Sequence, residues 1–454
     1  MLTAYPDHQF AEREEKAYTD RENNSRIQGY SDFLSKAHKV FFSMSMIVKD
    51  RVGRLFGKIQ HYSWGGYNFI PMLIGLKPEP DMTYAEYWMG AHEKAPSQIL
   101  RNDGTTIALN ELIKEQPEKT LGPRMFQRYG RLPFLLKVMD VREMLSIQVH
   151  PTKSEAEIGF ARENEMGIPL DAPERNYKDN NHKPELTVAL SDLWLLYGFR
   201  PENQFQEVLN QVPEFHALQP VFASGGYFGL YKYVMEMPQE LVNALLNTLV
   251  ERILQKYNAE ELEEASPDYW VAKTRVGKQG GDYDRGIFSM YFFNLVKLKQ
   301  GQATFQDAGI PHAYLQGQSI EIMANSDNVI RGGLTLKHVD VPELLRLITF
   351  KSVIPEIIVG RQSDNPHERF YESPSHDFCL SRIQLSKDDF YESSANSIEI
   401  LLVLSGETML DSAGKHMLVK KGESIVVFAG VNYLMRAISE DAVLFRAFIP
   451  SNGA

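Results

Sequence analysis

Short apolar or alternating segments, separated by turns rich in glycine and proline, recur along most of this 454-residue chain. Such segments are typical of short strands, whose side chains point alternately to opposite faces. Residues 201–275 break the pattern, because behind Pro238 the pairs Leu241–Val242, Leu245–Leu246 and Leu249–Val250 repeat every four residues. That spacing places an apolar stripe on one face of a helix. The chain is therefore expected to form β-sandwiches or barrels with an inserted helical domain.

Two parts of the chain share one cadence of strand, turn and strand. Residues 298–315 and residues 397–428 each carry apolar and β-branched runs that are broken at glycine. We interpret the likeness as a duplicated jelly-roll β-barrel. The second copy has Val431-Asn432-Tyr433 where the first has His312. We therefore expect the second barrel to have no metal site and to be structural.

The expected organisation is mainly β with an α-helical insertion. The domains that we assign are a polar N-terminal extension over residues 1–45 with a helix near 31–42, a first barrel over 46–200 and 276–349, the helical domain over 201–275, and a second barrel over 350–454. Inside the first barrel we expect helices near 109–129 and 154–164, and strands at 186–188, 193–198 and 287–299.

Composition and charge exclude several classes of protein. The net charge of −11 argues against non-specific binding to nucleic acid or to anionic membranes. A single cysteine, Cys379, excludes an intramolecular disulfide and a CxxC metal knuckle. No apolar run is long enough to span a bilayer, and the N-terminus lacks the order of a signal peptide. We expect a cytoplasmic protein that binds neither nucleic acid nor membrane.

The segment Ser146-Ile147-Gln148-Val149-His150-Pro151 is the first candidate for chemistry. It reads as a buried strand that leads into a turn at the proline. Side chains at i and i+2 of a strand share a face, so Gln148 and His150 point into one space. An amide oxygen and an imidazole can hold a divalent metal if further ligands arrive from elsewhere. Taken alone, such a pair is more often a satisfied part of the core.

Two further segments offer those ligands. In Asn181-His182-Lys183-Pro184-Glu185, strand parity places Lys183 and Glu185 on one face and His182 on the other. In Pro311-His312, the proline fixes the approach of the chain to the imidazole. Two nitrogens, a carboxylate and an amide oxygen suit zinc and leave a position open for water or substrate.

The segment from Glu321 to Lys337 begins with an acid and ends with two cations. Arg331, which two glycines follow, can reach a phosphate or an oxyanion with little steric hindrance. Lys337 can add a second charge. Asp327 is interpreted as a brace for this loop. The histidines that we assign to structural roles are His61, His92 and His338.

These motifs together resemble type I mannose-6-phosphate isomerase, also called phosphomannose isomerase, of the cupin superfamily. The resemblance covers nearly everything from residue 50 to 345, and residues 1–45 lie outside it. Leu336 replaces the proline that the family pattern has before Lys337, and smaller departures occur at Tyr87, Ile330 and Gly332. The segments that carry the resemblance are Gln60–Gly65, Tyr84–Gly90, Leu145–Pro151, Asn181–Glu185, Pro311–Leu315 and Ser326–Leu334.

The resemblance implies a role for each matching residue. The implied zinc ligands are Gln148, His150, Glu185 and His312, with one Zn²⁺ per chain. The implied catalytic arginine is Arg331, and the residues that match the substrate cavity are Trp64, Lys137, Ser146, Lys183, Tyr314, Glu321 and Lys337. The implied fold is a metal-binding cupin core, a helical domain and a C-terminal cupin-like jelly roll. We expect a monomer that acts on a small sugar phosphate.

The implied reaction interconverts mannose 6-phosphate and fructose 6-phosphate through an enediol. It needs positive charge near the forming enediolate and a base within hydrogen-bond reach of the moving proton. Glu321 and Lys183 are both candidates for that base. His182 could assist ring opening or be structural. A dianionic phosphate needs paired cations, for which Lys137, Arg331 and Lys337 are available.

Two other classes remain as alternatives. An iron-dependent cupin dioxygenase would more naturally use several histidines or two histidines and a carboxylate, whereas the glutamine ligand and the cationic loop favour the isomerase. A non-catalytic sugar-phosphate binder could keep the pocket without turnover, although no expected ligand is missing here. Metal analysis with an oxygen-uptake assay distinguishes the first alternative, and binding without turnover would indicate the second.

Overall fold

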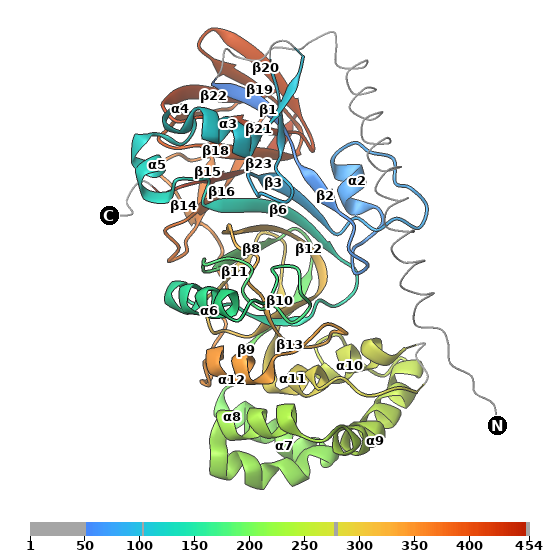
Figure 1. Ribbon diagram of the computed structural model, residues 1–454. Helices are drawn as coiled ribbons and strands as arrows, with labels where there is room; N and C mark the ends of the chain where they lie inside the picture. Colours follow the sequence, from blue (N-terminus) through green and yellow to red (C-terminus); the bar gives the residue numbers. More distant parts are fainter. Residues whose placement is uncertain (1–50, 102–103, 277–279, 451–454) are drawn as a thin grey trace, which may run out of the picture. The chain divides into compact units, whose positions relative to one another are not determined.

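The structure is a computed structural model that describes residues 51–101, 104–276 and 280–450. The polar extension expected over residues 1–45, with its helix, lies outside these residues. The strands of the described chain form three antiparallel sheets, beside which the helices pack (Figure 1). The expectation of a mainly β fold that also contains helices is confirmed.

One long strand, β12 (His312–Ala324), organises the ten-stranded sheet that carries the site. Its first half pairs with β9 and with one residue of β7, and its second half pairs with β6 and β8. The partners change at Gly317, where φ is +131° and a Cβ would lie 2.5 Å from the carbonyl oxygen of Asp192. The other strands of this sheet are β2 (Lys58–Gln60), β3 (Glu86–Gly90), β6 (Phe134–Val141), β7 (Ile147–Val149), β8 (Glu185–Ala189), β9 (Leu193–Phe199), β10 (Phe293–Leu298), β11 (Ala303–Gln306) and β13 (Ile330–Gly333).

Strand parity separates the apolar core from the site. In β6, Leu136 and Val138 point into a core that the sheet shares with the C-terminal strands, so Lys137 between them points to the opposite face. In β8, Leu186 lies in the same core, and Glu185 points the other way. Lys137 and Glu185 therefore lie on the inner face of this sheet, opposite the apolar core.

The inserted helical segment is present as expected. It lies at one end of the ten-stranded sheet (Figure 1) and consists of α7 (Glu202–Gln211), η1 (Pro213–Leu218), α8 (Gln219–Glu236), α9 (Gln239–Asn258) and α10 (Pro267–Arg275). The stripe predicted on α9 is buried at Val242, Leu246 and Leu249, whereas Leu241 remains 51% exposed.

The expected strand over residues 287–299 is wrong at its start. Residues 286–292 form helix α11 (Gly286–Phe292), and the strand β10 begins only at Phe293. Every residue of α11 is buried. A helix that is buried on all sides shows no alternation of apolar and polar residues, so its sequence cannot be distinguished from that of a buried strand.

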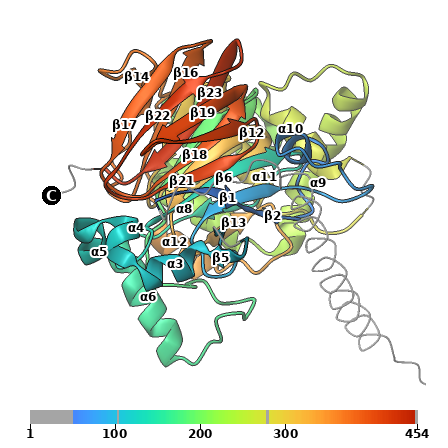
Figure 2. The ribbon, with the colours of Figure 1, turned by 90° about the horizontal axis from the view of Figure 1, so that it is seen from above.

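The C-terminal strands form two sheets, and β1 (Val52–Phe56) is a strand of the larger one. β1 pairs with β21 and lies beside it in both views (Figures 1 and 2). The larger sheet has the order β14 (Arg361–Gln362), β15 (Glu368–Tyr371), β16 (Cys379–Ser386), β23 (Asp441–Phe448), β18 (Glu399–Ser405), β21 (Ser424–Val427), β1, β4 (Gln98–Leu100), β5 (Thr106–Ala108). The smaller sheet has the order β17 (Phe390–Ala395), β22 (Val431–Ala437), β19 (Glu407–Ser412), β20 (Lys415–Lys420).

The remaining helices cover the sheets. They are α2 (Phe69–Leu73), α3 (Leu109–Glu115), α4 (Pro117–Leu121), α5 (Pro123–Tyr129), α6 (Lys153–Glu165) and α12 (Val341–Leu347). Those near 109–129 and 154–164 were expected, and the Thr152–Glu155 capping box explains where α6 begins. Among the described helices, none combines the length and apolar character that a membrane span requires.

Candidate metal centre

Three ligand-type side chains from different parts of the chain converge in the ten-stranded sheet. His150 follows β7, Glu185 begins β8, and His312 begins β12. Their ligand atoms all lie within 4.8 Å of one another, and all three side chains are buried. Within residues 51–101, 104–276 and 280–450 this is the one group of three or more His, Cys, Asp or Glu side chains that meets this distance.

Backbone contacts fix the orientation of both imidazoles. Nδ1 of His150 lies 2.9 Å from the carbonyl oxygen of Asn328, and Nδ1 of His312 lies 3.0 Å from that of Ile310. A carbonyl oxygen only accepts, so each Nδ1 carries the proton and donates it. Each Nε2 then presents a lone pair toward Glu185, at 3.4 Å from one of the two carboxylate oxygens.

This arrangement fits a divalent metal ion. Burial, assisted by the charge of Lys183, lowers the pKa of His150 to about 4, so its ring is neutral near pH 7. Its Nε2 is buried and has no hydrogen-bond partner among the described residues. The lone pairs of the two imidazole nitrogens and the negative charge of the carboxylate repel one another unless a cation lies between the three groups. The donor set, nitrogen and carboxylate oxygen, is one that zinc accepts.

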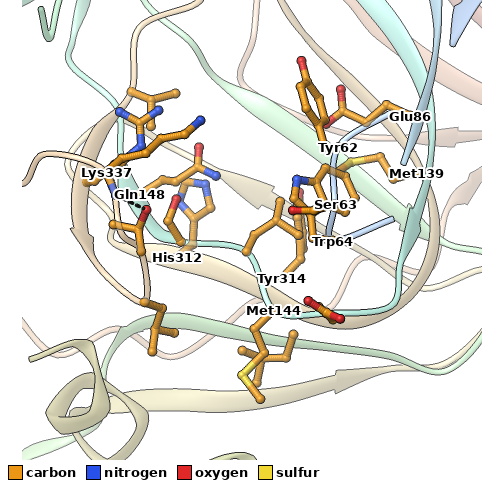
Figure 3. Close-up of a pocket in the computed structure, with 18 of the residues that line it drawn as sticks. Tyr62, Ser63, Trp64, Glu86, Met139, Met144, Gln148, His312, Tyr314 and Lys337 are labelled. Atoms are coloured by element: carbon orange, nitrogen blue, oxygen red, sulfur yellow. Dashed lines mark hydrogen bonds between the residues drawn. The ribbon is translucent and has the colours of Figure 1, made fainter. Parts of the chain in front are cut away.

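Gln148, the fourth predicted ligand, lies beside His312. It is the middle residue of β7, and its register partners are His312 on one side and Arg331 on the other. Gln148 and His312 lie side by side in the cavity (Figure 3). Gln148 lies in a strand, as the sequence predicted, whereas His150 lies just past the end of that strand.

Lys183 lies against the predicted ligand Glu185. Its ammonium nitrogen is 3.0 Å from Oε1 of that carboxylate. Burial alone would raise the pKa of Glu185, but the charge of Lys183 and the two imidazoles hold it well below its ordinary value. Residues 181–184 are irregular rather than strand. Even so, Lys183 and Glu185 share one side of the chain, as parity predicted.

Deeper in the cavity, Lys137 and Glu321 form a buried ion pair. The ammonium of Lys137 lies 2.9 Å from Oε2 of Glu321 and 3.7 Å from Oε2 of Glu86. The hydroxyl of Tyr314 donates to Oε1 of Glu321 at 3.0 Å. Burial by itself would lower the pKa of Lys137, but these two carboxylates hold it above its ordinary value. Burial also raises the pKa of Glu321, which Lys137 opposes.

Arg331 and Lys337 differ from the other two cations because they are uncompensated. Within the described residues, no carboxylate forms an ion pair with either side chain. Burial lowers the pKa of Arg331, and burial together with the Arg331 charge lowers that of Lys337. Both line the same cavity as Glu185 and His312, so this cavity holds positive charge that forms no ion pair with a described carboxylate.

Trp64 and Ser146, the other predicted substrate residues, also line this cavity of about 980 Å³. The ring of Trp64 stacks on Tyr62 with centroids 5.7 Å apart. Figure 3 shows Tyr62, Trp64 and Glu86 on one side and Gln148, His312 and Lys337 on the other. The aromatic wall thus faces the metal-ligand and cationic wall.

The remaining histidines lie outside the metal-ligand triad. His182 forms an ion pair with Asp377 at 2.7 Å and does not line the cavity, so the structure favours its structural role over ring opening. His92 contacts Asp327 at 3.2 Å, and Lys94 contacts the same carboxylate at 2.6 Å. Asp327 lines the cavity and its carboxylate is held by these two side chains, while its bracing of the loop that carries Arg331 stays a prediction.

Sequence reasoning missed three carboxylate or hydroxyl groups of the site. Glu86 shares the parity of Trp88 in β3 and contacts Lys137, a signal that parity could have provided. Thr187, which contacts the Tyr314 hydroxyl, shares the parity of Glu185. Asp284 lies in an irregular segment before α11, where no periodic signal exists.

The chain is similar in sequence to proteins of known function. Residues 52–202 match the family described as phosphomannose isomerase type I, catalytic domain. Mannose-6-phosphate isomerase of Escherichia coli is 35% identical over 389 residues, which cover 83% of this chain and 94% of that protein. The human mannose-6-phosphate isomerase is 32% identical over 431 residues, which cover 87% of this chain and 98% of that protein.

The chain belongs to the type I phosphomannose isomerase family. The family and the aldose–ketose isomerase class predicted from the sequence are therefore confirmed. A crystal structure of mannose 6-phosphate isomerase from Salmonella typhimurium, bound to fructose 6-phosphate and zinc, matches with a TM-score of 0.77 and 33% identity, over 88% of this chain and 99% of that one. A zinc-bound mannose 6-phosphate isomerase matches with a TM-score of 0.76 and the same identity and coverage. Zinc in these relatives agrees with the donor set found here.

Proposed function

We propose that this chain interconverts mannose 6-phosphate and fructose 6-phosphate at the His150–Glu185–His312 centre. One observation carries the proposal: a buried metal-ligand triad shares its cavity with two uncompensated cations, Arg331 and Lys337. A metal centre suits chemistry at a sugar carbonyl, and the cations suit a phosphate. The relatives named mannose-6-phosphate isomerase support this choice of substrate.

Gln148, His150, Glu185 and His312 would hold the metal, with one zinc ion per chain. When bound, zinc supplies a Lewis acid that stabilises negative charge on the sugar oxygens. The hydrogen bonds from the two Nδ1 atoms to backbone carbonyls keep both imidazoles oriented for this role.

The chain's own residues would move the proton. A base removes the hydrogen from C2 of the open-chain aldose while the C1 oxygen gains a proton, which gives an enediol. Loss of the proton on the C2 oxygen and return of a proton to C1 then give the ketose. Glu321 is the stronger candidate base, because burial raises its pKa above the ordinary value and Tyr314 and Lys137 orient both oxygens. Lys183 remains the second candidate, although Glu185 engages its ammonium.

Arg331 and Lys337 would bind the phosphate and stabilise charge near the reacting carbons. A guanidinium and an ammonium that form no ion pair with the described carboxylates are ready to pair with a dianion. Lys137 was a third candidate for the phosphate, but its charge is engaged by Glu321 and Glu86. We assign it instead to orienting Glu321. Trp64, Ser146 and Tyr314 would shape the sugar subsite.

The finer description of the fold is also part of this proposal. Residues 46–200 and 276–349 would form the metal-binding cupin domain around the inserted helical domain of 201–275, and residues 350–454 a second, duplicated cupin-like jelly roll without metal. Buried side chains there, Glu399, Tyr433 and Arg446, contact one another. The proposal includes a cytoplasmic monomer, and the net charge of −11 argues against binding to nucleic acid or to anionic membranes.

The test is an assay of mannose 6-phosphate conversion before and after removal of metal by a chelator. We expect activity to vanish with the metal and to return when zinc is added. Full activity in protein shown by elemental analysis to be metal-free would contradict the proposed mechanism.

An iron-dependent dioxygenase is the second candidate, because His150, Glu185 and His312 are also the two-histidine, one-carboxylate set of such enzymes. That function gives no role to the uncompensated cations. Iron in the purified protein, with oxygen uptake in the presence of a substrate, would favour it over the isomerase.

A further inference from the structure

We propose that Asp284 is a positioning residue that holds the loop between the two phosphate-binding cations. The loop comprises residues 332–337 and joins Arg331 to Lys337. Asp284 lies directly before α11 and lines the same cavity. The inference rests on the proposed function in one respect: it takes Arg331 and Lys337 as the groups that bind the phosphate.

The carboxylate of Asp284 accepts hydrogen bonds from three backbone N–H groups. Oδ1 accepts from Gly286 at 2.6 Å and from Leu334 at 2.8 Å, and Oδ2 accepts from Thr335 at 3.0 Å. The hydroxyl of Thr335 in turn accepts from the N–H of Lys337 at 3.1 Å. A continuous chain of hydrogen bonds thus runs from Asp284 to the backbone of Lys337.

The loop needs this support because its backbone is unusual. Gly333 has φ of +123° and Leu334 has φ of +54°, a left-handed conformation that a leucine rarely adopts. The amides of Leu334 and Thr335 point to one side as a result, and Asp284 receives both. Contact is close, since a Cβ at Gly333 would lie 2.6 Å from Cα of Gly286. Because Gly286 and Gly333 have no side chains, the carboxylate of Asp284 can reach the loop.

The other end of the loop is anchored to the metal centre. Arg331 lies in β13, directly across from Gln148 in β7. Asp284 anchors the far end of the same loop to the start of α11. The positions of both cations relative to the metal ligands therefore depend on two attachments, of which one is this carboxylate.

A direct role on substrate does not fit Asp284, although it lines the cavity. A carboxylate close to a phosphate would repel it. Here both oxygens are already used by backbone donors, which partly offset the charge. The geometry therefore assigns Asp284 to holding the loop and leaves substrate contact to the cations.

The experiment compares Asp284→Ala and Asp284→Asn with a matched control, Asp389→Asn. Asp389 accepts a backbone hydrogen bond from Ser386 at 3.0 Å in the C-terminal sheets and does not line the cavity. The asparagine at 284 keeps the shape but accepts through one atom only, so it preserves one side of the contact. Hydrogen–deuterium exchange of residues 333–337, calorimetric binding of inorganic phosphate, zinc content, KM and kcat are measured for each protein.

We expect the amides of residues 333–337 to exchange faster in both variants at 284. The Kd for inorganic phosphate should rise by about tenfold or more, and both effects should be larger for Asp284→Ala than for Asp284→Asn. KM should rise more than kcat falls, and the zinc content should equal that of the wild type. The Asp389→Asn protein should match the wild type in all of these. Unchanged exchange or unchanged phosphate affinity in both variants would overturn the inference, as would loss of zinc. If the wild type bound phosphate but did not isomerise sugar phosphates, the expected exchange and affinity changes would still support Asp284 while the proposed function failed.

Discussion

The ammonium of Lys137 and the carboxylate of Glu321 face each other across β6 and β12 at 2.9 Å, with 6% and 2% of their surfaces exposed. The two residues are register partners, so the ion pair follows directly from the pairing of the strands. Removing one member leaves a buried charge without its partner. The pair is therefore expected to matter both for the proposed chemistry and for the stability of the sheet.

Replacing the proposed base isolates its role. Glu321→Gln keeps the size and a hydrogen-bond acceptor for Tyr314 but cannot take up a proton. We expect kcat to fall by about 10²–10⁴-fold while zinc content is retained, as steady-state kinetics and elemental analysis would show. Near-normal kcat in Glu321→Gln, together with a large loss in Lys183→Met, would transfer the role of base to Lys183.

The two cations of the loop should separate in their effects. Arg331→Ala should lower kcat by about 10²–10³-fold without loss of metal, because the guanidinium would stabilise developing charge. Lys337→Ala should mainly raise KM, since this residue is exposed and lies beyond the end of β13, whereas Arg331 is the register partner of Gln148. Lys299→Ala, an exposed lysine paired with Asp192, is the control and should match the wild type. Normal turnover in Arg331→Ala would remove it from the chemistry.

His312→Ala should lose zinc and activity together, because one of the proposed ligands and half of the imidazole set disappear. Zinc per folded protein, measured by elemental analysis alongside the isomerase assay, checks this. His182→Ala is the matched control, because that imidazole contacts Asp377 and lies outside the cavity. A fully metallated and active His312→Ala protein would exclude His312 as a ligand.

Removal of metal should also destabilise the fold. Two bare imidazole nitrogens and a carboxylate share a buried space, so an ion that binds the folded state adds stability by mass action, by about 4 kcal/mol at a thousandfold excess over Kd. We expect the melting temperature to fall by several degrees on chelation and to recover with added zinc. The same scan on His312→Ala should show no response to chelator. An identical melting temperature with and without metal in the wild type would contradict a bound ion at this centre.

The C-terminal sheets contain a buried charge cluster of their own. Arg446 pairs with Glu399 at 2.6 Å and with Glu368 at 3.0 Å. Arg446→Ala should lower the free energy of unfolding by about 3–5 kcal/mol, because two buried carboxylates lose their partner. Arg361→Ala, which breaks an exposed pair with Glu372, should cost about 1 kcal/mol or less. Denaturant unfolding measures both, and equal effects would show that burial does not govern the cost.

The amino-acid sequence by itself determined much of the site. Strand parity predicted that Gln148, Lys183 and Glu185 point to the site, and the proline before His312 indicated the last of the expected ligands. The stripe of α9 predicted the helical insertion, because its period differs from that of strands. The family pattern connected these local signals, which are individually ambiguous, into one expected centre.

Only the tertiary structure decided which charges are compensated and where separate segments meet. Lys137, Lys183, Arg331 and Lys337 look alike in the sequence, yet the first two form ion pairs with carboxylates, and the last two form none in the part of the chain that the structure describes. The pairing of β1 with β21, the helix at 286–292 and the contact of Asp284 with the loop were equally hidden. Local periodicity depends on neighbours within a few residues, whereas ion pairs and strand partners depend on groups that only the folded chain brings together.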